Sequence, residues 1–270
     1  YSLPSTGGLW LNNSNYSHTG LNGSPTYSGL LRVTAGTFKF GTATGNTPTL
    51  AATTIFYIDG GALNFASRLN SASALTYNQS SGTVNINQNG NTFSATPSFG
   101  LSSTTASITM SGGTIQLHLI SGGTTPQDWN LQSAISGTIG TTVIFGSTST
   151  VTRGASGFIF SARGNLPNVL IDSVTNNKTL RDSVGAMNIQ GTLTIPTGCT
   201  FDNGGTGTTA TVASMNGNVV NRGNITISNV SASNRIQFGG TSAQTYNAGG
   251  FTGNFGTNAS PVLGVNISNA

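Results

Sequence analysis

Hydrophobic and polar residues alternate along residues 107–119, and the glycine pair Gly112 and Gly113 interrupts the alternation. Period-two alternation is typical of a β-strand with one buried face, and glycine allows backbone turns that other residues resist. Relative to Gly113, the positions expected to be buried are five and three residues before it and two and four residues after it: Ile108, Met110, Ile115 and Leu117. The segment therefore predicts two short strands joined at a corner.

Three more segments keep the same register around Gly36, Gly61 and Gly82, so the reference glycines are 25, 21 and 31 residues apart. Their positions expected to be buried are Leu31, Val33, Phe38, Phe40, Phe56, Ile58, Leu63, Phe65, Tyr77, Gln79, Val84 and Ile86, of which only Gln79 departs from the apolar pattern. The position three residues after the glycine is polar in every unit: Lys39, Asn64, Asn85 and Gln116. Self-similarity at this period indicates a repeat architecture.

A unit of two short strands cannot bury its apolar face alone, so the units must stack on one another around a continuous core. We expect Leu63, Val84 and Ile115 to lie in one column of that core. Parallel crossover connections are strongly right-handed. The pattern therefore predicts an all-β fold, a right-handed parallel β-solenoid (β-helix) of roughly nine to eleven rungs.

The chain divides into three stretches of different style within one elongated domain. Residues 1–28 predict an opening rung or cap with a strand only near residues 8–12, and residues 29–165 predict a β-solenoid with glycine-centred repeats. Residues 166–270 predict a continuing β-solenoid with a changed repeat, in which Gly191 and Gly223 are each followed by apolar residues two and four positions later. Because a strand has just started at Val265, we expect the chain to be a fragment of a longer protein.

Charged residues are only 5% of the chain, against about 25% in ordinary globular domains. The net charge is +4, and the Lys and Arg residues do not gather into a basic surface, which argues against nucleic-acid binding. No apolar run of about 18 residues occurs, so we expect no membrane insertion. Cys199 is the single cysteine, which excludes an intrachain disulfide, and we expect it to pack in the core.

Few side chains can change charge, and the sequence predicts no catalytic, cofactor-binding or metal-binding residue. The five Asp residues are scattered, whereas glycoside hydrolysis uses two carboxylates close together. Asp59 and Asp202 precede glycines, as turn residues do, and each is a single carboxylate where calcium usually needs several ligands. His118 is expected to face solvent.

Two alternative functions stay open. One is a carbohydrate-active enzyme on a β-helix (a polysaccharide lyase or hydrolase), and the other, suggested by the pair Thr192 and Thr194, is an ice-binding β-solenoid.

The segments 168–171, 191–201, 218–227 and 238–246 resemble repeats of very long, adhesin-like surface proteins that gram-negative bacteria export by type IX secretion. The resemblance covers residues 166–270 well and residues 30–165 in general style. It implies a non-enzymatic structural or adhesive module of a secreted cell-surface fibre or filament, with no catalytic residue. The implied partners are further rungs of the same polypeptide or end-to-end copies, together with a surface polysaccharide.

Two triplets, Asp172-Ser173-Val174 and Asp182-Ser183-Val184, resemble the Asp-Ser/Thr-aliphatic acceptor sites for O-glycans on proteins exported by such bacteria. Short triplets also arise by chance in a chain rich in Ser and Thr. The resemblance predicts glycosylation at Ser173 and Ser183, and chance occurrence stays the alternative.

Overall fold

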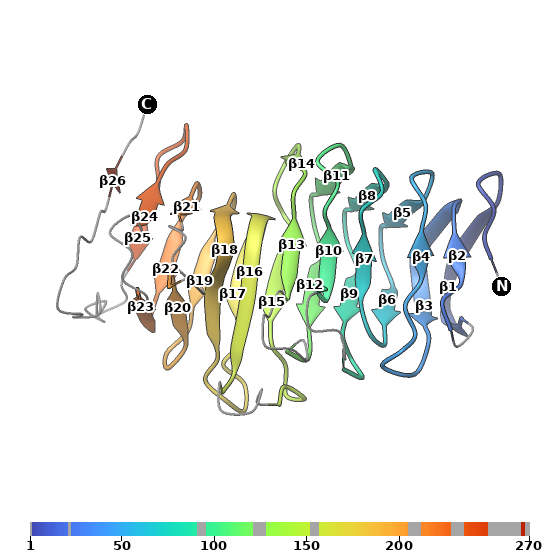
Figure 1. Cartoon of the computed structure of the whole chain (residues 1–270), viewed down its shortest axis with the longest axis horizontal. Coiled ribbons are helices and arrows are strands. Elements are labelled where there is room, and N and C mark those ends of the chain that lie inside the picture. The colour runs from blue at the N-terminus through green and yellow to red at the C-terminus, as the bar shows by residue number, and fades with distance from the viewer. Residues whose placement is uncertain are drawn as a thin grey trace.

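The computed structural model describes residues 2–20, 23–90, 96–120, 128–151, 157–204, 212–227, 235–247 and 266–267. In these residues the chain is entirely β, with no helix, and the strands stack into an elongated body with β1 near one end and β25 near the other (Figure 1). The pairs between these strands are parallel throughout. The predicted all-β parallel solenoid is therefore confirmed, while its right-handed sense stays a prediction.

Three strands make each rung in the middle of the chain, and from β8 to β13 each strand pairs with the third strand before it and the third strand after it. These rungs are β5 (Ile55–Ile58), β6 (Ala62–Phe65) and β7 (Leu69–Ser71); β8 (Thr76–Gln79), β9 (Thr83–Ile86) and β10 (Phe99–Leu101); and β11 (Ser107–Met110), β12 (Thr114–Leu117) and β13 (Trp129–Leu131). The two strands on either side of Gly61, Gly82 and Gly113 thus enter two different ladders.

Two of the strands before β5, β1 and β3, are longer than β5, and β3 passes through the corner at Gly36. β3 (Leu30–Phe40) pairs with β5 through one half and with β6 through the other, and β1 (Gly8–Thr19) runs alongside it. The prediction of a strand only near residues 8–12 was too short, because β1 continues past two register shifts, on either side of Asn12. β2 (Thr26–Tyr27) and β4 (Thr49–Leu50) form a separate two-stranded sheet.

The four reference glycines adopt the left-handed backbone conformation at the corners, with φ of +82° at Gly36, +57° at Gly61, +69° at Gly82 and +79° at Gly113. L-residues with a Cβ atom rarely adopt this conformation. A Cβ atom on Gly113 would also collide with the carbonyl oxygen of Gly82 on the rung before it. Both the backbone angle and the stacking therefore require glycine here.

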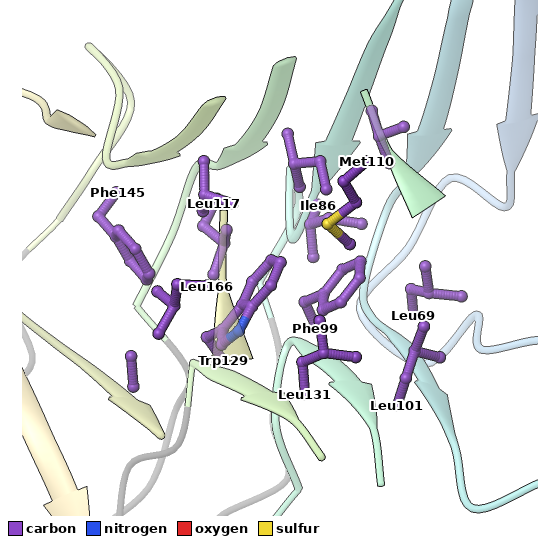
Figure 2. Packing of buried hydrophobic residues seen from close by; sticks show 14 of the residues in the cluster. Leu69, Ile86, Phe99, Leu101, Met110, Leu117, Trp129, Leu131, Phe145 and Leu166 are labelled. Carbon is purple, nitrogen blue, oxygen red and sulfur yellow. The ribbon is translucent and has the colours of Figure 1, made fainter. Parts of the chain in front are cut away.

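The predicted core is confirmed, since every residue expected to be buried around the four glycines is at most 3% exposed. Leu63 pairs with Val84 and Val84 with Ile115, so these three lie in one column. The column continues through four more buried residues: Val143, Val169, Leu193 and Val219. Aromatic rings also stack from rung to rung, and Phe99 and Trp129 lie parallel with centroids 4.0 Å apart (Figure 2).

Gln79, the one polar residue at a predicted core position, is fully buried and makes hydrogen bonds there. The Tyr77 hydroxyl donates to Gln79 Oε1 at 2.7 Å, and Gln79 Nε2 donates to the Thr114 carbonyl at 3.0 Å. Burial raises the pKa of Tyr77 and keeps its phenol protonated as a donor. The amide therefore links two rungs inside the core.

The strand arrangement changes after β14 (Ile135–Ser136). β16 (Ile159–Leu166) and β18 (Thr179–Ile189) are long strands that pair along two stretches, with a register shift between Ala162 and Gly164. Two ladders diverge from β18: one contains β20 (Thr200–Asp202) and β23 (Asn224–Thr226), and the other contains β21 (Val212–Met215), β24 (Arg235–Phe238) and β26 (Asn266–Ile267).

A third ladder of the later rungs continues directly from β12. Its strands are β15 (Thr142–Phe145), β17 (Asn168–Ile171), β19 (Leu193–Ile195), β22 (Val219–Asn221) and β25 (Tyr246–Asn247). From β1 through β3, β6, β9 and β12 to β25, this ladder has ten strands in the described residues, which agrees with roughly nine to eleven rungs.

The prediction that Gly223 corresponds to Gly191 is wrong. Val219 pairs with Leu193, so Gly217 stands where Gly191 stands one rung earlier. Ile225, which follows Gly223, pairs instead with Phe201 in another ladder. The error arose because both corners are followed by the same alternation of polar and apolar residues. Val265 itself lies outside the described residues, and the two residues that follow it form β26, which pairs with β24.

Candidate functional site

In the part of the chain that the structure describes, three ion pairs each join segments distant along the sequence or close a loop. Arg32 pairs with Asp59, Lys178 Nζ lies 2.7 Å from Asp172 Oδ2, and Arg181 Nε lies 2.8 Å from Asp202 Oδ2. Asp59 and Asp202, the two carboxylates that precede glycines, are therefore bound by arginines. Among the described residues, no group of three or more His, Cys, Asp or Glu side chains could hold a metal ion.

An exposed aromatic platform, made of Trp10, Arg32 and Tyr57, lies on the outer face of β1, β3 and β5. The three residues are direct neighbours across the strands. The guanidinium carbon of Arg32 lies 5.2 Å from the centroid of the Trp10 ring and 5.7 Å from that of Tyr57. Trp10 is 58% exposed and Tyr57 is 39% exposed. Cation–π attraction stabilises this stack.

Polar contacts fix the platform from below. Trp10 Nε1 donates to Thr34 Oγ1 at 2.9 Å, and Thr34 Oγ1 donates to Asp59 Oδ1 at 2.7 Å, while Arg32 donates to the other oxygen of Asp59. Burial works to raise the pKa of Asp59, but the hydrogen bonds from Arg32 and Thr34 outweigh it and hold the pKa below its usual value. The sequence reasoning missed this site, although Trp10 and Tyr57 stand in the outward phase of their strands.

The predicted glycosylation site at Ser173 lies in a well-anchored loop. Lys178 is 1% exposed, and besides Asp172 it donates to the carbonyls of Val174 at 2.9 Å and Asn176 at 3.0 Å. Ser173 and Val174 are both exposed on the outside of this loop. A loop held in this way presents its serine to solvent at a fixed position.

Ser183 has a different setting, because it belongs to β18 between the two stretches that pair with β16. The preceding Asp182 is fully buried, and the side chain of Ser183 lies outside the described residues. Glycosylation stays a prediction at Ser173 and at Ser183.

The densest basic stretch of the sequence, residues 178–181, does not form a basic surface. Lys178 is buried against Asp172, and Arg181 binds Asp202. Cys199 is fully buried beside them, with Sγ 3.6 Å from the Asp172 carbonyl, and burial raises the pKa of its thiol. The expectation that Cys199 packs in the core is confirmed.

The outer ladder of polar residues is hydrogen-bonded between rungs. Asn85 Nδ2 donates to Asn64 Oδ1 at 2.7 Å, and His118 Nε2 lies 2.9 Å from Asn85 Oδ1. His118 is half-buried, so the expectation of a solvent-facing histidine was only partly right; burial lowers the pKa of the imidazole. These side chains stabilise the stack.

Comparison with known proteins assigns no family. No protein-family model matches the chain, and searches of curated proteins and of solved structures found no significant match. The described residues also contain no helix that could span a membrane.

Proposed function

We propose that this chain is a non-enzymatic structural and adhesive module of a secreted cell-surface fibre. The observation that carries the proposal is the unbroken ladder from β1 to β25, in which every rung adds backbone hydrogen bonds along the same axis. A continuous parallel stack makes a stiff rod, and a rod that repeats weak contacts along its side gains avidity without any single strong site.

The positions of the carboxylates support a structural role over hydrolysis or lyase chemistry. Asp59, Asp172 and Asp202 form ion pairs. Asp128 and Asp182 are fully buried, and Asp128 Oδ2 accepts a hydrogen bond from the Ser161 backbone at 2.8 Å. A hydrolase needs two carboxylates open to the substrate, whereas these five are used inside the fold.

The resemblance of residues 166–270 to adhesin-like repeats exported by type IX secretion supports an extracellular location. Its implied partners are further rungs or end-to-end copies and a surface polysaccharide. Few charged residues and many Ser, Thr and Asn residues in the chain suit hydrogen bonds to the hydroxyl groups of a polysaccharide.

Immunogold electron microscopy of intact cells of the source organism, with antibodies against residues 1–270, tests the location. We expect gold particles along extracellular fibres, and labelling only after permeabilisation would overturn the proposal.

The purified chain should release no reducing ends or unsaturated sugars from a panel of polysaccharides and should show no thermal hysteresis in ice. A positive result in either assay would favour the enzyme or the ice-binding alternative.

Intact-mass spectrometry of the protein from its native host tests the glycan sites. We expect added hexose-type mass that falls when Ser173→Ala is introduced and disappears when Ser183→Ala is added. An unmodified mass in the native host would refute the acceptor triplets and leave the fibre proposal intact.

A further inference from the structure

A row of outward-facing side chains runs along the stack from the aromatic platform. It crosses β1, β3, β5, β8, β11 and β14, and each member pairs in strand register with the next. None of its members is buried. We name it the outer track, and its six residues are Trp10, Arg32, Tyr57, Asn78, Thr109 and Ser136. With neighbouring strands about 4.8 Å apart, the outer track is about 24 Å long.

The aromatic end of the outer track offers open ring surface. The guanidinium of Arg32 lies over the Trp10 ring and takes up one of its faces, yet Trp10 is still 58% exposed. In the described residues β1 has no partner strand other than β3, so the opposite face of the indole is open to solvent. A sugar ring carries an apolar C–H face, and burying it against an open aromatic ring removes apolar surface of both from water.

The outer track carries no net charge. Its one cation, Arg32, donates through Nε to Asp59 Oδ2 at 2.9 Å and forms an ion pair with that carboxylate. The other five members are uncharged. A charged ligand would therefore find no free counter-charge here, whereas a neutral ligand loses nothing.

The other end of the outer track offers polar groups that the fold does not use. Within the described part of the chain, the side chains of Asn78, Thr109 and Ser136 make no hydrogen bond to the protein. On the next ladder, by contrast, Asn85 Nδ2 donates to Asn64 Oδ1 at 2.7 Å. A hydroxyl can both donate and accept, and a side-chain amide can do the same through its two ends, as sugar hydroxyls require.

We propose that the outer track binds a neutral, extended, β-linked polysaccharide chain lying along the axis of the solenoid. Sugar rings pack against Trp10 and Tyr57, and sugar hydroxyls form hydrogen bonds with the polar end of the track. One side chain per rung, about 4.8 Å apart, matches a polymer whose extended chain advances by one pyranose ring over a similar length. This inference rests on the proposed adhesive function and names its site and ligand class.

Isothermal titration calorimetry of residues 1–270 tests the proposal with four hexasaccharides. We expect cellohexaose or chitohexaose, which are neutral and extended, to bind with a Kd below about 1 mM. Maltohexaose, which is neutral but coiled, should bind at least about tenfold more weakly. Hexagalacturonate should bind no more tightly than the better neutral probe. No binding of either extended probe, equal binding of maltohexaose, or tighter binding of hexagalacturonate would overturn the proposal.

Exposed aromatic variants locate the ligand. Trp10→Ala should weaken binding of the extended probe by about tenfold or more. Tyr16→Ala is the matched control, because Tyr16 is 52% exposed on the same strand but lies outside the outer track. Its affinity should equal that of the parent. An equal loss in both variants, or no loss in Trp10→Ala, would refute the assigned site.

Tryptophan fluorescence gives a second readout that does not depend on a loss of affinity. The chain has two tryptophans, and Trp129 is fully buried, so acrylamide quenching reports on Trp10. A saturating extended probe should reduce quenching in the parent. Trp10→Phe keeps an aromatic ring, so it should still bind the probe but show no probe-dependent change in quenching. Unchanged quenching in the parent would place the ligand elsewhere and overturn the proposal.

The polar end is tested by Thr109→Ala against Thr194→Ala, an outward-facing threonine on another ladder. Loss of one hydrogen bond in Thr109→Ala should weaken binding by about two- to tenfold, and Thr194→Ala should bind as the parent does. Equal affinities would confine the ligand to the aromatic end and refute a chain along the track. None of these results changes the immunogold test, so failure of the track and failure of the extracellular fibre proposal are distinguishable.

Discussion

The rungs around Gly61, Gly82 and Gly113 and the rungs that begin with β15 continue one ladder but turn their corners differently. In the earlier rungs, each corner residue is a glycine with positive φ. In the β15 rung, the pairing of Val143 with Ile115 places Thr141 where Gly113 stands. The Thr141 hydroxyl donates to the Gly112 carbonyl at 2.8 Å. The comparison teaches that the apolar column defines a rung, whereas the corner can be built in more than one way.

The outer face of the same ladder changes as well. Along this ladder, the outward-facing polar residues Asn64, Asn85 and Gln116 are followed by Ile144 and Leu170 at the paired positions of the next two strands. Asn64, Asn85 and Gln116 make hydrogen bonds to neighbouring rungs. Ile144 and Leu170 place apolar side chains at the equivalent position of the later rungs. The two regions therefore share an interior and differ in the surfaces they offer to a partner.

Ile115→Asp should have the largest effect, because it places an unpaired carboxylate in the column that both regions share. We expect a loss of more than about 4 kcal/mol in the free energy of unfolding. Ser107→Asp, an exposed change on the neighbouring strand β11, should stay within about 0.5 kcal/mol. Urea unfolding followed by circular dichroism measures both, and a small effect of Ile115→Asp would contradict the assigned register.

Lys178→Met should come next, because it removes one partner of a buried ion pair in the later rungs and leaves Asp172 without its cation. Breaking such a pair destabilises proteins by about 3 kcal/mol or more. Arg222→Met, at an exposed position, serves as the control. If hydrogen exchange showed no loss of protection in residues 172–178, Lys178 would not anchor this loop.

Gly113→Ala tests the corner of the earlier rungs against Gly137→Ala, whose φ of +77° nearly equals the +79° of Gly113. A Cβ atom at Gly137 would meet nothing within 4 Å, whereas at Gly113 it would collide with the backbone of Gly82. We expect Gly137→Ala to lower the free energy of unfolding by about 1 kcal/mol, from backbone strain alone, and Gly113→Ala to lower it by about 3 kcal/mol. Equal losses in thermal melts would mean that rung-to-rung contact adds nothing to the glycine requirement.

Acid should produce the smallest effect, at the aromatic platform. Since the pKa of Asp59 is lower in the folded state, its contribution to stability is present above the unfolded pKa of about 3.9 and is lost as the pH falls through the folded value. Asp59→Asn should therefore be less stable than the parent at pH 7, and the gap should shrink towards pH 2. A gap that stays constant over this range would exclude the Arg32 interaction as its cause.

The sequence predicted the earlier rungs because one short pattern sets both the corner and the core there. Leu63, Val84 and Ile115 share a phase with their glycines, so register could be deduced by counting residues. The later rungs could not be deduced in this way. β16 and β18 pair along two stretches separated by a register shift, and Gly217, not Gly223, occupies the position equivalent to Gly191. Alternation identifies a strand, but it does not identify which ladder that strand joins.

The functional surfaces were harder to predict than the core. Trp10 and Arg32 are 22 positions apart, and only the parallel register of β1 and β3 brings them together. Sites of this kind depend on which residues of different rungs become neighbours, and a repeat pattern read along the sequence does not contain that information.

The uneven spacing of the glycine corners has a mechanical consequence. Backbone hydrogen bonds between rungs point along the stack, so a pulling force on the two ends loads them one after another. Detaching the repeats of 25, 21 and 31 residues would release about 90, 70 and 110 Å of extended chain in turn. A fibre built from such rungs would lengthen in unequal steps under tension, and each step would identify the rung that gave way.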